Sequence, residues 1–305
     1  MWYLCFFLSL ALAPLQFGVI NKVKAFFAGR KGAPVLQPYF DLVKLLRKGG
    51  VHSAGGSVVL RIAPSVSLAA VLAAALFFPF GMAAAPLAFW GDVVVLFYLV
   101  GMGRFFMALG AFDTGSPFEG MGATRELQFS ALAESVVLVV AAFLALATDR
   151  MDLAGLLNSS ESSVWAGAGT SIILCALAFY AVLLAENCRV PFDDPETHLE
   201  LTMMHEAMIL DYAGPDLAFI QYGAALKLWL FASFLTLMLA PFDAAAHPAV
   251  NALAYFGGVG AVSLAVGVTE SVMGRFRFLK IPQVFAGALA VSLIAILLFV
   301  FTRAG

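Results

Sequence analysis

The segment from Arg189 to Gly214, RVPFDDPETHLELTMMHEAMILDYAG, concentrates side chains that bind and release protons. It holds eight acidic residues and histidines: Asp193, Asp194, Glu196, His198, Glu200, His205, Glu206 and Asp211. The whole chain is only 12% charged. Burial and neighbouring charges move the pKa values of carboxylates and imidazoles toward neutral pH or away from it. The segment is therefore a candidate for proton handling, or for ion pairing with a partner.

We expect no metal site in this segment. Its four candidate ligands do not form the His-Glu-x-x-His pattern of zinc enzymes: His198, Glu200, His205 and Glu206. His198 and His205 are seven residues apart, which is roughly 10 Å along a helix, so one ion would not bind both. The three cysteines are far apart and form no Cys-x-x-Cys pair: Cys5, Cys175 and Cys188. The sequence thus predicts no cofactor on this chain and no catalytic residue.

A second set of charged residues lies within long apolar runs: Arg104, Glu134, Glu186, Lys227 and Glu270. A charge near the centre of a bilayer costs about 2.5–3.5 kcal/mol on insertion scales, so each side chain needs a partner or water. For Glu134 and Lys227 we favour a proton or ion path, and the alternative is a fixed Glu–Lys or Glu–Arg pair. For Glu186 and Glu270, at the ends of their runs, snorkelling or an ion pair is an equal alternative.

The elements that position these residues are membrane helices. The chain is 62% hydrophobic with a mean hydropathy of +0.96, whereas a soluble domain is roughly 45–50% apolar. A spanning helix needs about 20 mostly apolar residues. Eight segments meet this condition, at about 2–21, 62–83, 91–111, 127–148, 165–187, 216–240, 250–271 and 281–302. The sequence predicts an all-α integral membrane protein, with residues 1–305 forming one polytopic domain.

Composition also excludes some alternatives. The net charge of −2 gives no reason to expect a nucleic-acid partner. The first apolar run lacks a basic n-region and a clear cleavage site, so we expect a retained helix rather than a signal peptide. The segment 37–48 alternates apolar and charged residues at helical spacing, which predicts an amphipathic helix on the cytoplasmic membrane surface.

The basic residues predict an orientation. If the 22–61 connection is cytoplasmic, that side holds thirteen Lys and Arg residues, and the other side holds only Arg150 and Arg303. This positive-inside bias places both termini outside and the acidic segment in the cytoplasm. The cytoplasmic connections then supply candidate residues for docking a partner: Arg30, Asp41, Lys44, Asp113, Glu119, Arg125, Glu126, Arg189, Asp194, His198 and Glu206.

Two of these connections have a predicted local structure. Residues 113–126 are rich in glycine and predict a compact loop that leads into the fourth span, with Thr124 as a helix cap. Residues 196–212 predict a helix with Asp194 as its N-cap and Pro195 at its first position. Leucine and methionine occur all around that helix, which is not typical of a solvated loop. We expect it to lie under another protein or to fold back on the spans.

Three stretches resemble a known family: GRKGAPVLQPYFDLVKLL, RFFMALGAFDTGSPFEGMGATRE and ENCRVPFDDPETHLE followed by LDYAGPDLAFIQYGAALKL. They are similar to the membrane-anchor subunit of group 4 energy-converting [NiFe] hydrogenases, of the hydrogenase-4 component C and formate hydrogenlyase subunit 4 type. That group is similar in turn to the quinone-chamber membrane subunit of respiratory complex I. The resemblance extends over nearly the whole chain, and the 113–118 motif favours the hydrogenase branch.

The resemblance implies a non-catalytic subunit in the bacterial inner membrane. It implies hydrogenase large and small subunits on the cytoplasmic face, which hold the [NiFe] and Fe-S groups, and antiporter-like subunits in the membrane. It places Asp193, Glu196 and Glu200 on the family's acidic loop and Glu134 at its fourth-span glutamate. In complex I a further acid stands where this chain has His198. A complex I quinone-site subunit, a stand-alone transporter and a purely structural anchor are the alternatives.

Overall fold

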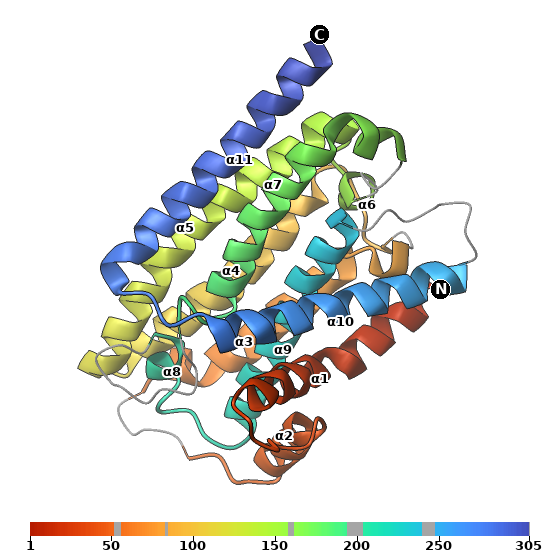
Figure 1. Cartoon of the computed structure of the whole chain (residues 1–305). Helices are drawn as coiled ribbons and strands as arrows, with labels where there is room; N and C mark the ends of the chain where they lie inside the picture. The colour runs from red at the N-terminus through yellow and green to blue at the C-terminus, as the bar shows by residue number, and fades with distance from the viewer. Residues whose placement is uncertain (52–55, 83–84, 158–161, 194–203, 240–247, 305) are drawn as a thin grey trace.

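A computed structural model describes residues 1–51, 56–82, 85–157, 162–193, 204–239 and 248–304 (Figure 1). Eight helices in it are long and apolar enough to cross a membrane, by length and composition. They are α1 (Trp2–Phe27), α3 (Val58–Phe77), α4 (Asp92–Asp113), α5 (Pro117–Thr148), α7 (Ser162–Glu186), α9 (Pro215–Leu239), α10 (Pro248–Val272) and α11 (Ile281–Ala304). The described residues contain no strand. The predicted all-α membrane fold with eight spans is therefore confirmed.

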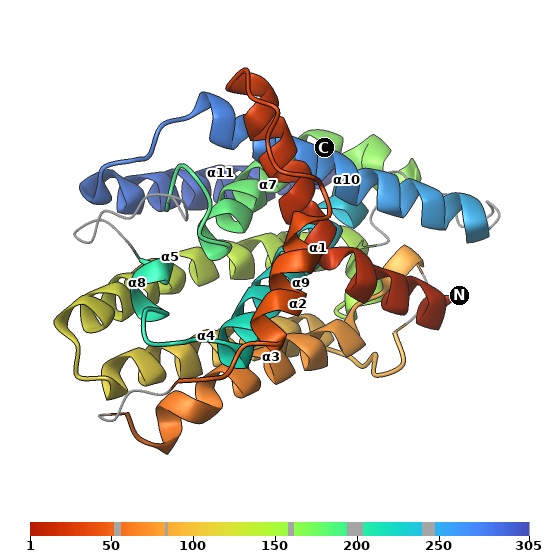
Figure 2. The same cartoon turned by 90° about the horizontal axis from the view of Figure 1, so that it is seen from below.

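Short elements connect these helices. They are α2 (Gln37–Leu46), the 3-10 turn Phe80–Met82, α6 (Leu153–Leu157), α8 (His205–Met208) and the 3-10 turn Phe278–Lys280. The predicted helix at 37–48 is confirmed as α2. It exposes Phe40, Val43 and Leu46 and packs against α1 and α9. Seen from below, α2 lies over α1 and α9 (Figure 2).

Helix α9 forms the centre of the bundle. Its apolar window is 78% buried, more than that of any other spanning helix in the described residues. It packs against α1, α3, α7 and α10. In Figure 1, α1 and α10 run side by side at an angle to α5, α7 and α11. A central helix in contact with four other spanning helices is the natural place for a buried charged group such as Lys227.

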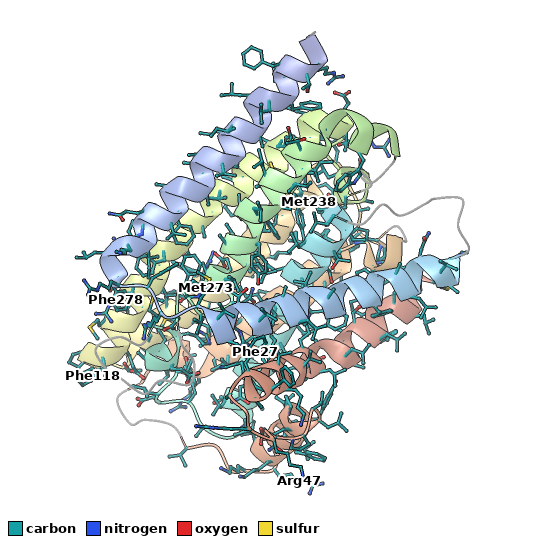
Figure 3. The ribbon with its side chains drawn as sticks, viewed as in Figure 1. Phe27, Arg47, Phe118, Met238, Met273 and Phe278 are labelled. Atoms are coloured by element: carbon teal, nitrogen blue, oxygen red, sulfur yellow. The ribbon has the colours of Figure 1, made fainter. Side chains whose placement is uncertain are left out.

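Polar connections gather at one end of the bundle. The start of α5, α8 and α2 lie at the lower end in Figure 1, away from both chain termini. Phe118 and Phe278 mark this end in Figure 3, and Met238 lies toward the opposite end. The Arg125 guanidinium stacks over the Phe278 ring at 4.5 Å, which joins α5 to the turn before α11. The same end therefore brings together residues from several connections.

Several helix boundaries differ from prediction. Helix α1 continues to Phe27 rather than ending near residue 21, and α3 begins at Val58 rather than near residue 62. Helix α5 begins at Pro117, so the expected compact loop at 113–126 is wrong for residues 117–126. Proline is favourable at the first helical position, where its missing N–H costs nothing. Thr124 is not the cap, because its hydroxyl donates to the Gly120 carbonyl within the helix. Helix α3 ends at Phe77 rather than residue 83, since Phe78 is extended before Pro79.

The acidic segment folds back on the spans wherever it is described. Met204, Ala207, Met208, Ile209 and Tyr212 are buried. Among the described residues of this segment, only His205–Met208 is helical, and the chain then turns. The predicted helix is therefore wrong for Met204 and for residues 209–212. Asp194, the predicted N-cap, lies outside the described residues, and so do Glu196, His198 and Glu200. Close packing requires a glycine at position 122, where a Cβ would lie 2.7 Å from the Met204 carbonyl oxygen.

Candidate functional site

A buried ion cluster joins three spanning helices. Glu186, at the end of α7, lies between Arg104 of α4 and Lys227 of α9. Arg104 donates to one carboxylate oxygen, and the Lys227 ammonium lies 3.2 Å from the other. Lys227 also donates to the Glu186 backbone carbonyl. Because two cations surround one carboxylate, this three-residue cluster has an excess positive charge when all three groups are ionised.

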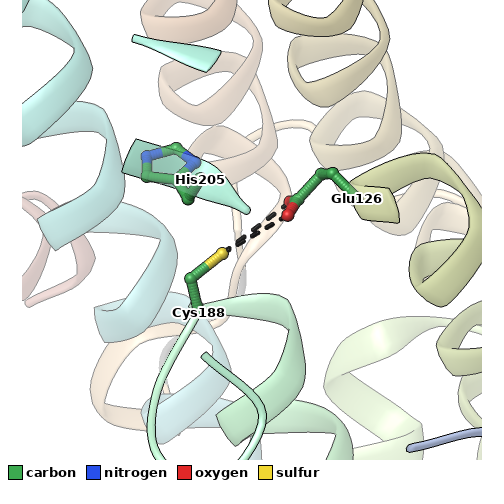
Figure 4. A group of neighbouring side chains, drawn as sticks. All are labelled: Glu126, Cys188 and His205. Carbon is green, nitrogen blue, oxygen red and sulfur yellow. Dashed lines mark hydrogen bonds between the residues drawn. The ribbon is translucent and has the colours of Figure 1, made fainter. Parts of the chain in front are cut away.

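A second carboxylate lies beside the cluster. Glu126 on α5 is only 8% exposed, and its charge acts on both Lys227 and Arg104. The Cys188 thiol donates to its two oxygens at 3.5 and 3.8 Å. His205 approaches from α8, and one donor atom each of Glu126, Cys188 and His205 lie within 4.8 Å of one another (Figure 4). Three separate segments thus bring a carboxylate, a thiol and an imidazole together.

Ion pairs tie the two ends of the 188–193 connection to other helices. Glu270 of α10 lies 3.4 Å from Arg189 and 3.3 Å from Lys24 of α1. Asp193 accepts from Arg275 at 3.0 Å and from the His205 backbone N–H at 3.2 Å. The side chains of Glu270 and Asp193 are almost fully buried. These contacts fix the backbone that presents Cys188.

A cavity of about 330 Å³ opens beside these groups. Its charged and titratable lining residues are Asp41, Arg104, Glu126, Glu186, Cys188, Arg189, His205, Glu206 and Lys227. Its apolar wall comes from α1, α4, α8 and α9 and includes Phe17, Met107, Met208 and Ile220. Ionisable groups therefore face one space that reaches from the end of the bundle, at α2 and α8, to the Arg104–Glu186–Lys227 cluster.

Burial sets the protonation of the groups outside the spans. It lowers the pKa of His205, so the imidazole is neutral at pH 7. Burial, and then the neighbouring Glu126 carboxylate, raise the pKa of the Cys188 thiol well above its ordinary value. Burial also raises the pKa of Tyr212, and nearby carboxylates add to that effect. At neutral pH these three side chains are therefore uncharged.

The remaining predicted path residues are more dispersed. Glu134 is half-buried on α5, two turns beyond Glu126, and its charge acts on Arg104. It does not line the cavity. Asp211 is exposed, and its backbone N–H donates to buried Glu119 at 3.2 Å. The structure thus brings Arg104, Glu186 and Lys227 together directly and leaves Asp211 at the surface.

Several predicted docking residues have contacts within the chain. The Asp113 carboxylate accepts from the backbone N–H groups of Ser57 at 2.6 Å and Leu60 at 3.3 Å, so it caps the start of α3. Glu119, Glu126 and Arg189 are buried. Arg30 and Lys44 are exposed, and Asp41 accepts a hydrogen bond from Gln37. A docking role for these residues stays a prediction.

Sequence reasoning missed Cys188 as a site residue. It follows Glu186 closely at the end of a predicted span and precedes Arg189 and a Val-Pro-Phe break. A cysteine between charged residues at a helix end is a different setting from Cys5 and Cys175 within apolar runs. This difference was visible in the sequence. The contact between Cys188 and Glu126, which are 62 positions apart, could not be predicted from the sequence.

A comparison with models of known protein families shows to which family this chain belongs. The model of the family described as NADH dehydrogenase matches residues 1–301. The chain belongs to the NADH dehydrogenase family.

Curated relatives in this family come from several membrane complexes. Hydrogenase-4 component C of Escherichia coli (strain K12) is 29% identical over 280 residues, which cover 90% of this chain and 87% of that protein. Formate hydrogenlyase subunit 4 of the same organism is 30% identical over 299 residues, covering 93% and 95%. One NADH-quinone oxidoreductase subunit of Geobacter metallireducens is 30% identical over 225 residues, covering 65% and 64%. The resemblance to hydrogenase and complex I membrane subunits is therefore confirmed.

A solved structure has the same fold. A chain of the membrane-bound sulfane sulfur reductase, an archaeal respiratory membrane complex, matches with a TM-score of 0.85. The match covers 98% of each chain at 18% sequence identity. The fold of this chain is thus found in an archaeal respiratory membrane complex.

Proposed function

We propose that this chain docks a soluble [NiFe] and Fe-S arm and couples its redox reaction to translocation of protons or Na⁺. The hydrogenase large and small subunits would bind at the end of the bundle formed by α2, α8 and the start of α5. Antiporter-like membrane subunits would bind along the bundle. In this proposal all redox groups belong to partner subunits, and this chain contributes ionisable side chains.

The observation that supports coupling is the number of ionisable residues that line one cavity. Asp41, Glu206 and His205 line it together with Glu126, Glu186 and Lys227. A redox event that changes the charge at the outer end of such a cavity shifts the proton affinity of the buried groups. Glu126 and Glu186 are 8% and 6% exposed, so bulk water screens them little. A change at the docking end would therefore reach the interior of the bundle.

The proposed location follows from the charge distribution. The chain would lie in a bacterial inner membrane with its docking end in the cytoplasm and both termini on the periplasmic side. Thirteen basic residues on the docking side and two on the other support this orientation.

Replacement of one path carboxylate tests the proposal. Glu134 does not line the cavity, but its charge acts on Arg104, which does. We expect Glu134→Gln to leave the complex assembled and to lower ion translocation per electron transferred, because an amide of the same shape does not carry a proton. The matched control is Asp149→Asn, since Asp149 is 74% exposed at the opposite end and pairs with Arg303. Inverted membrane vesicles would be assayed for hydrogen-linked dye reduction and for ion uptake. An unchanged ratio in Glu134→Gln would contradict the coupling role of Glu134.

The apolar wall of the cavity supports a second candidate function. A complex I quinone-site subunit would use this space for a quinone, and 330 Å³ is within the ordinary range of small-molecule sites. This candidate predicts quinone reductase activity and no nickel in the purified complex. A nickel-containing arm with hydrogen-linked activity would support the first proposal instead.

A further inference from the structure

The cluster of Glu126, Cys188 and His205 has the donor set of a metal site. A thiol, an imidazole and a carboxylate each present one donor atom, and these atoms lie within 4.8 Å of one another. They come from α5, from the connection after α7 and from α8. Figure 4 shows the three side chains meeting from these segments. A mixed sulfur, nitrogen and oxygen set suits Zn²⁺ better than Mg²⁺ or Ca²⁺, which prefer oxygen alone.

The distances are close to those of a bound ion. Zinc bonds of about 2.3 Å to sulfur and about 2.0–2.2 Å to nitrogen and oxygen place tetrahedral ligand atoms roughly 3.5 Å apart. The nearer Glu126 oxygen is already 3.5 Å from the Cys188 sulfur. The His205 nitrogen lies within 4.8 Å of the other two ligand atoms, so it needs to approach them by at most roughly one ångström. Side-chain rotation supplies a movement of this size.

One ring nitrogen of His205 is free to bind a metal ion. His205 Nδ1 is buried and has no hydrogen-bond partner among the described residues. Buried polar atoms are nearly always satisfied, so such an atom calls for an explanation. The backbone of His205 is held in place by Asp193. A metal ion between His205, Cys188 and Glu126 would satisfy the nitrogen without moving that backbone.

The charges of the ligands balance that of a dication. Glu126 is a deeply buried carboxylate whose charge also acts on Arg104 and Lys227. Zinc binding would displace the thiol proton to solvent and leave one thiolate, one carboxylate and one neutral imidazole around Zn²⁺. The formal charge of that group is zero. A neutral group is the least costly ionic arrangement in a buried site.

We propose that Glu126, Cys188 and His205 bind one Zn²⁺ ion through three protein ligands, with the fourth position open to the 330 Å³ cavity. All three residues line that cavity, which provides the path by which the ion enters. The bound ion would tie α8 to α5 and to the end of α7, and it would hold the folded-back segment against the spans. This site does not depend on the proposed redox coupling, because it follows from the ligands alone.

Metal binding by the full-length chain tests the proposal. The purified chain is stripped with EDTA, and its affinity for Zn²⁺ is measured by competition with a chromogenic chelator. We expect one Zn²⁺ per chain. Loss of an outer-shell partner of a zinc ligand lowers affinity about 10–100-fold, so loss of a ligand itself lowers it at least about tenfold. We therefore expect at least that loss in Cys188→Ala and in His205→Ala.

The matched control is Cys175→Ala, which removes a fully buried thiol from α7 away from the cluster. It is expected to bind Zn²⁺ as the unaltered chain does. A sulfur-to-cobalt charge-transfer band after loading with Co²⁺ gives a second readout in the unaltered chain. This band identifies a thiolate ligand even if a ligand variant fails to fold.

Two outcomes would overturn the site. The first is the absence of stoichiometric binding in the unaltered chain. The second is an adventitious ion only, which is binding that persists in both ligand variants and gives no thiolate band with Co²⁺. Since neither readout uses electron transfer or ion translocation, the result is separate from any failure of the proposed coupling function.

Discussion

Glu186 is the side chain on which the central ion cluster depends. Its carboxylate contacts both Arg104 and Lys227, and all three side chains are at least 85% buried. Long charged side chains within apolar helices are stable only when such contacts compensate their desolvation. The geometry therefore supports the ion-pair interpretation of Lys227 directly. A proton path through the same residues remains compatible, because a carboxylate between two cations can exchange partners.

We expect Glu186→Gln to destabilise the protein by about 3–5 kcal/mol, because it removes the carboxylate that contacts two buried cations and leaves Glu126 as their shared counter-charge. The measurement is thermal unfolding of the detergent-solubilised chain. The matched control is Asp149→Asn, whose exposed pair with Arg303 contributes at most about 1 kcal/mol. The double variant Glu186→Gln/Lys227→Met should be less destabilised than the sum of the two single variants. Equal decreases in unfolding temperature for Glu186→Gln and Asp149→Asn would show that the Arg104–Glu186–Lys227 cluster does not stabilise the fold.

The folded-back segment between α8 and α9 packs through Tyr212. Its ring is 6% exposed, and its hydroxyl has no hydrogen-bond partner among the described residues. The hydroxyl lies against Gly110 of α4, where a Cβ would approach it to 2.5 Å. A buried hydroxyl without a partner costs roughly 1–3 kcal/mol in protein mutational data. The segment is thus held by apolar contact and not by this hydroxyl.

We expect Tyr212→Phe to keep or slightly raise stability at neutral pH and to change its dependence on alkaline pH. The pKa of Tyr212 is raised in the folded chain. The stability that comes from keeping this hydroxyl protonated is therefore fully present below the ordinary tyrosine pKa of about 10, and it is lost as the pH rises toward the pKa of the folded chain. The unaltered chain should therefore lose more stability above pH 10 than the variant does. Unfolding temperatures at pH 8 to 11 measure this difference. Tyr3→Phe, at a 66% exposed position, serves as control, and identical curves for all three proteins would refute the expectation.

The sequence predicted the helices of this bundle better than its site. Twenty apolar residues in a row are a local property, so the eight spans could be recognised one by one. The start of α5 was missed because glycines such as Gly120 and Gly122 are unfavourable inside a helix. Here a glycine is needed at position 122, because a side chain would collide with the Met204 backbone. The meeting of Glu126, Cys188 and His205 depends on how α5, α7 and α8 pack together. Local pattern contains no information about such contacts between distant segments.

The arrangement of the whole chain makes one prediction about orientation. An even number of spans places both termini on the same side, and Figure 1 shows α2 and α8 at the lower end of the bundle, away from both termini. Exposed basic residues such as Arg47 and Lys48 lie at the α2 end. Since positively charged connections remain in the cytoplasm, the α2 end should face the cytoplasm.

Reporter fusions in a bacterial host test this orientation. We expect alkaline phosphatase fused after Gly305 to be active and green fluorescent protein at the same place to be dark, because both report a periplasmic terminus. Fusions that end after Lys48 contain α1 and α2 alone and should give the opposite pattern. The two fusions after Lys48 are the control, because they have the same N-terminus as the fusions after Gly305 but contain one span instead of eight. A fluorescent fusion after Gly305 would put the acidic segment on the outer side, where a cytoplasmic redox arm cannot bind it. The docking proposal would then be wrong, whereas the zinc site, which depends on three contacts within the chain, would stand.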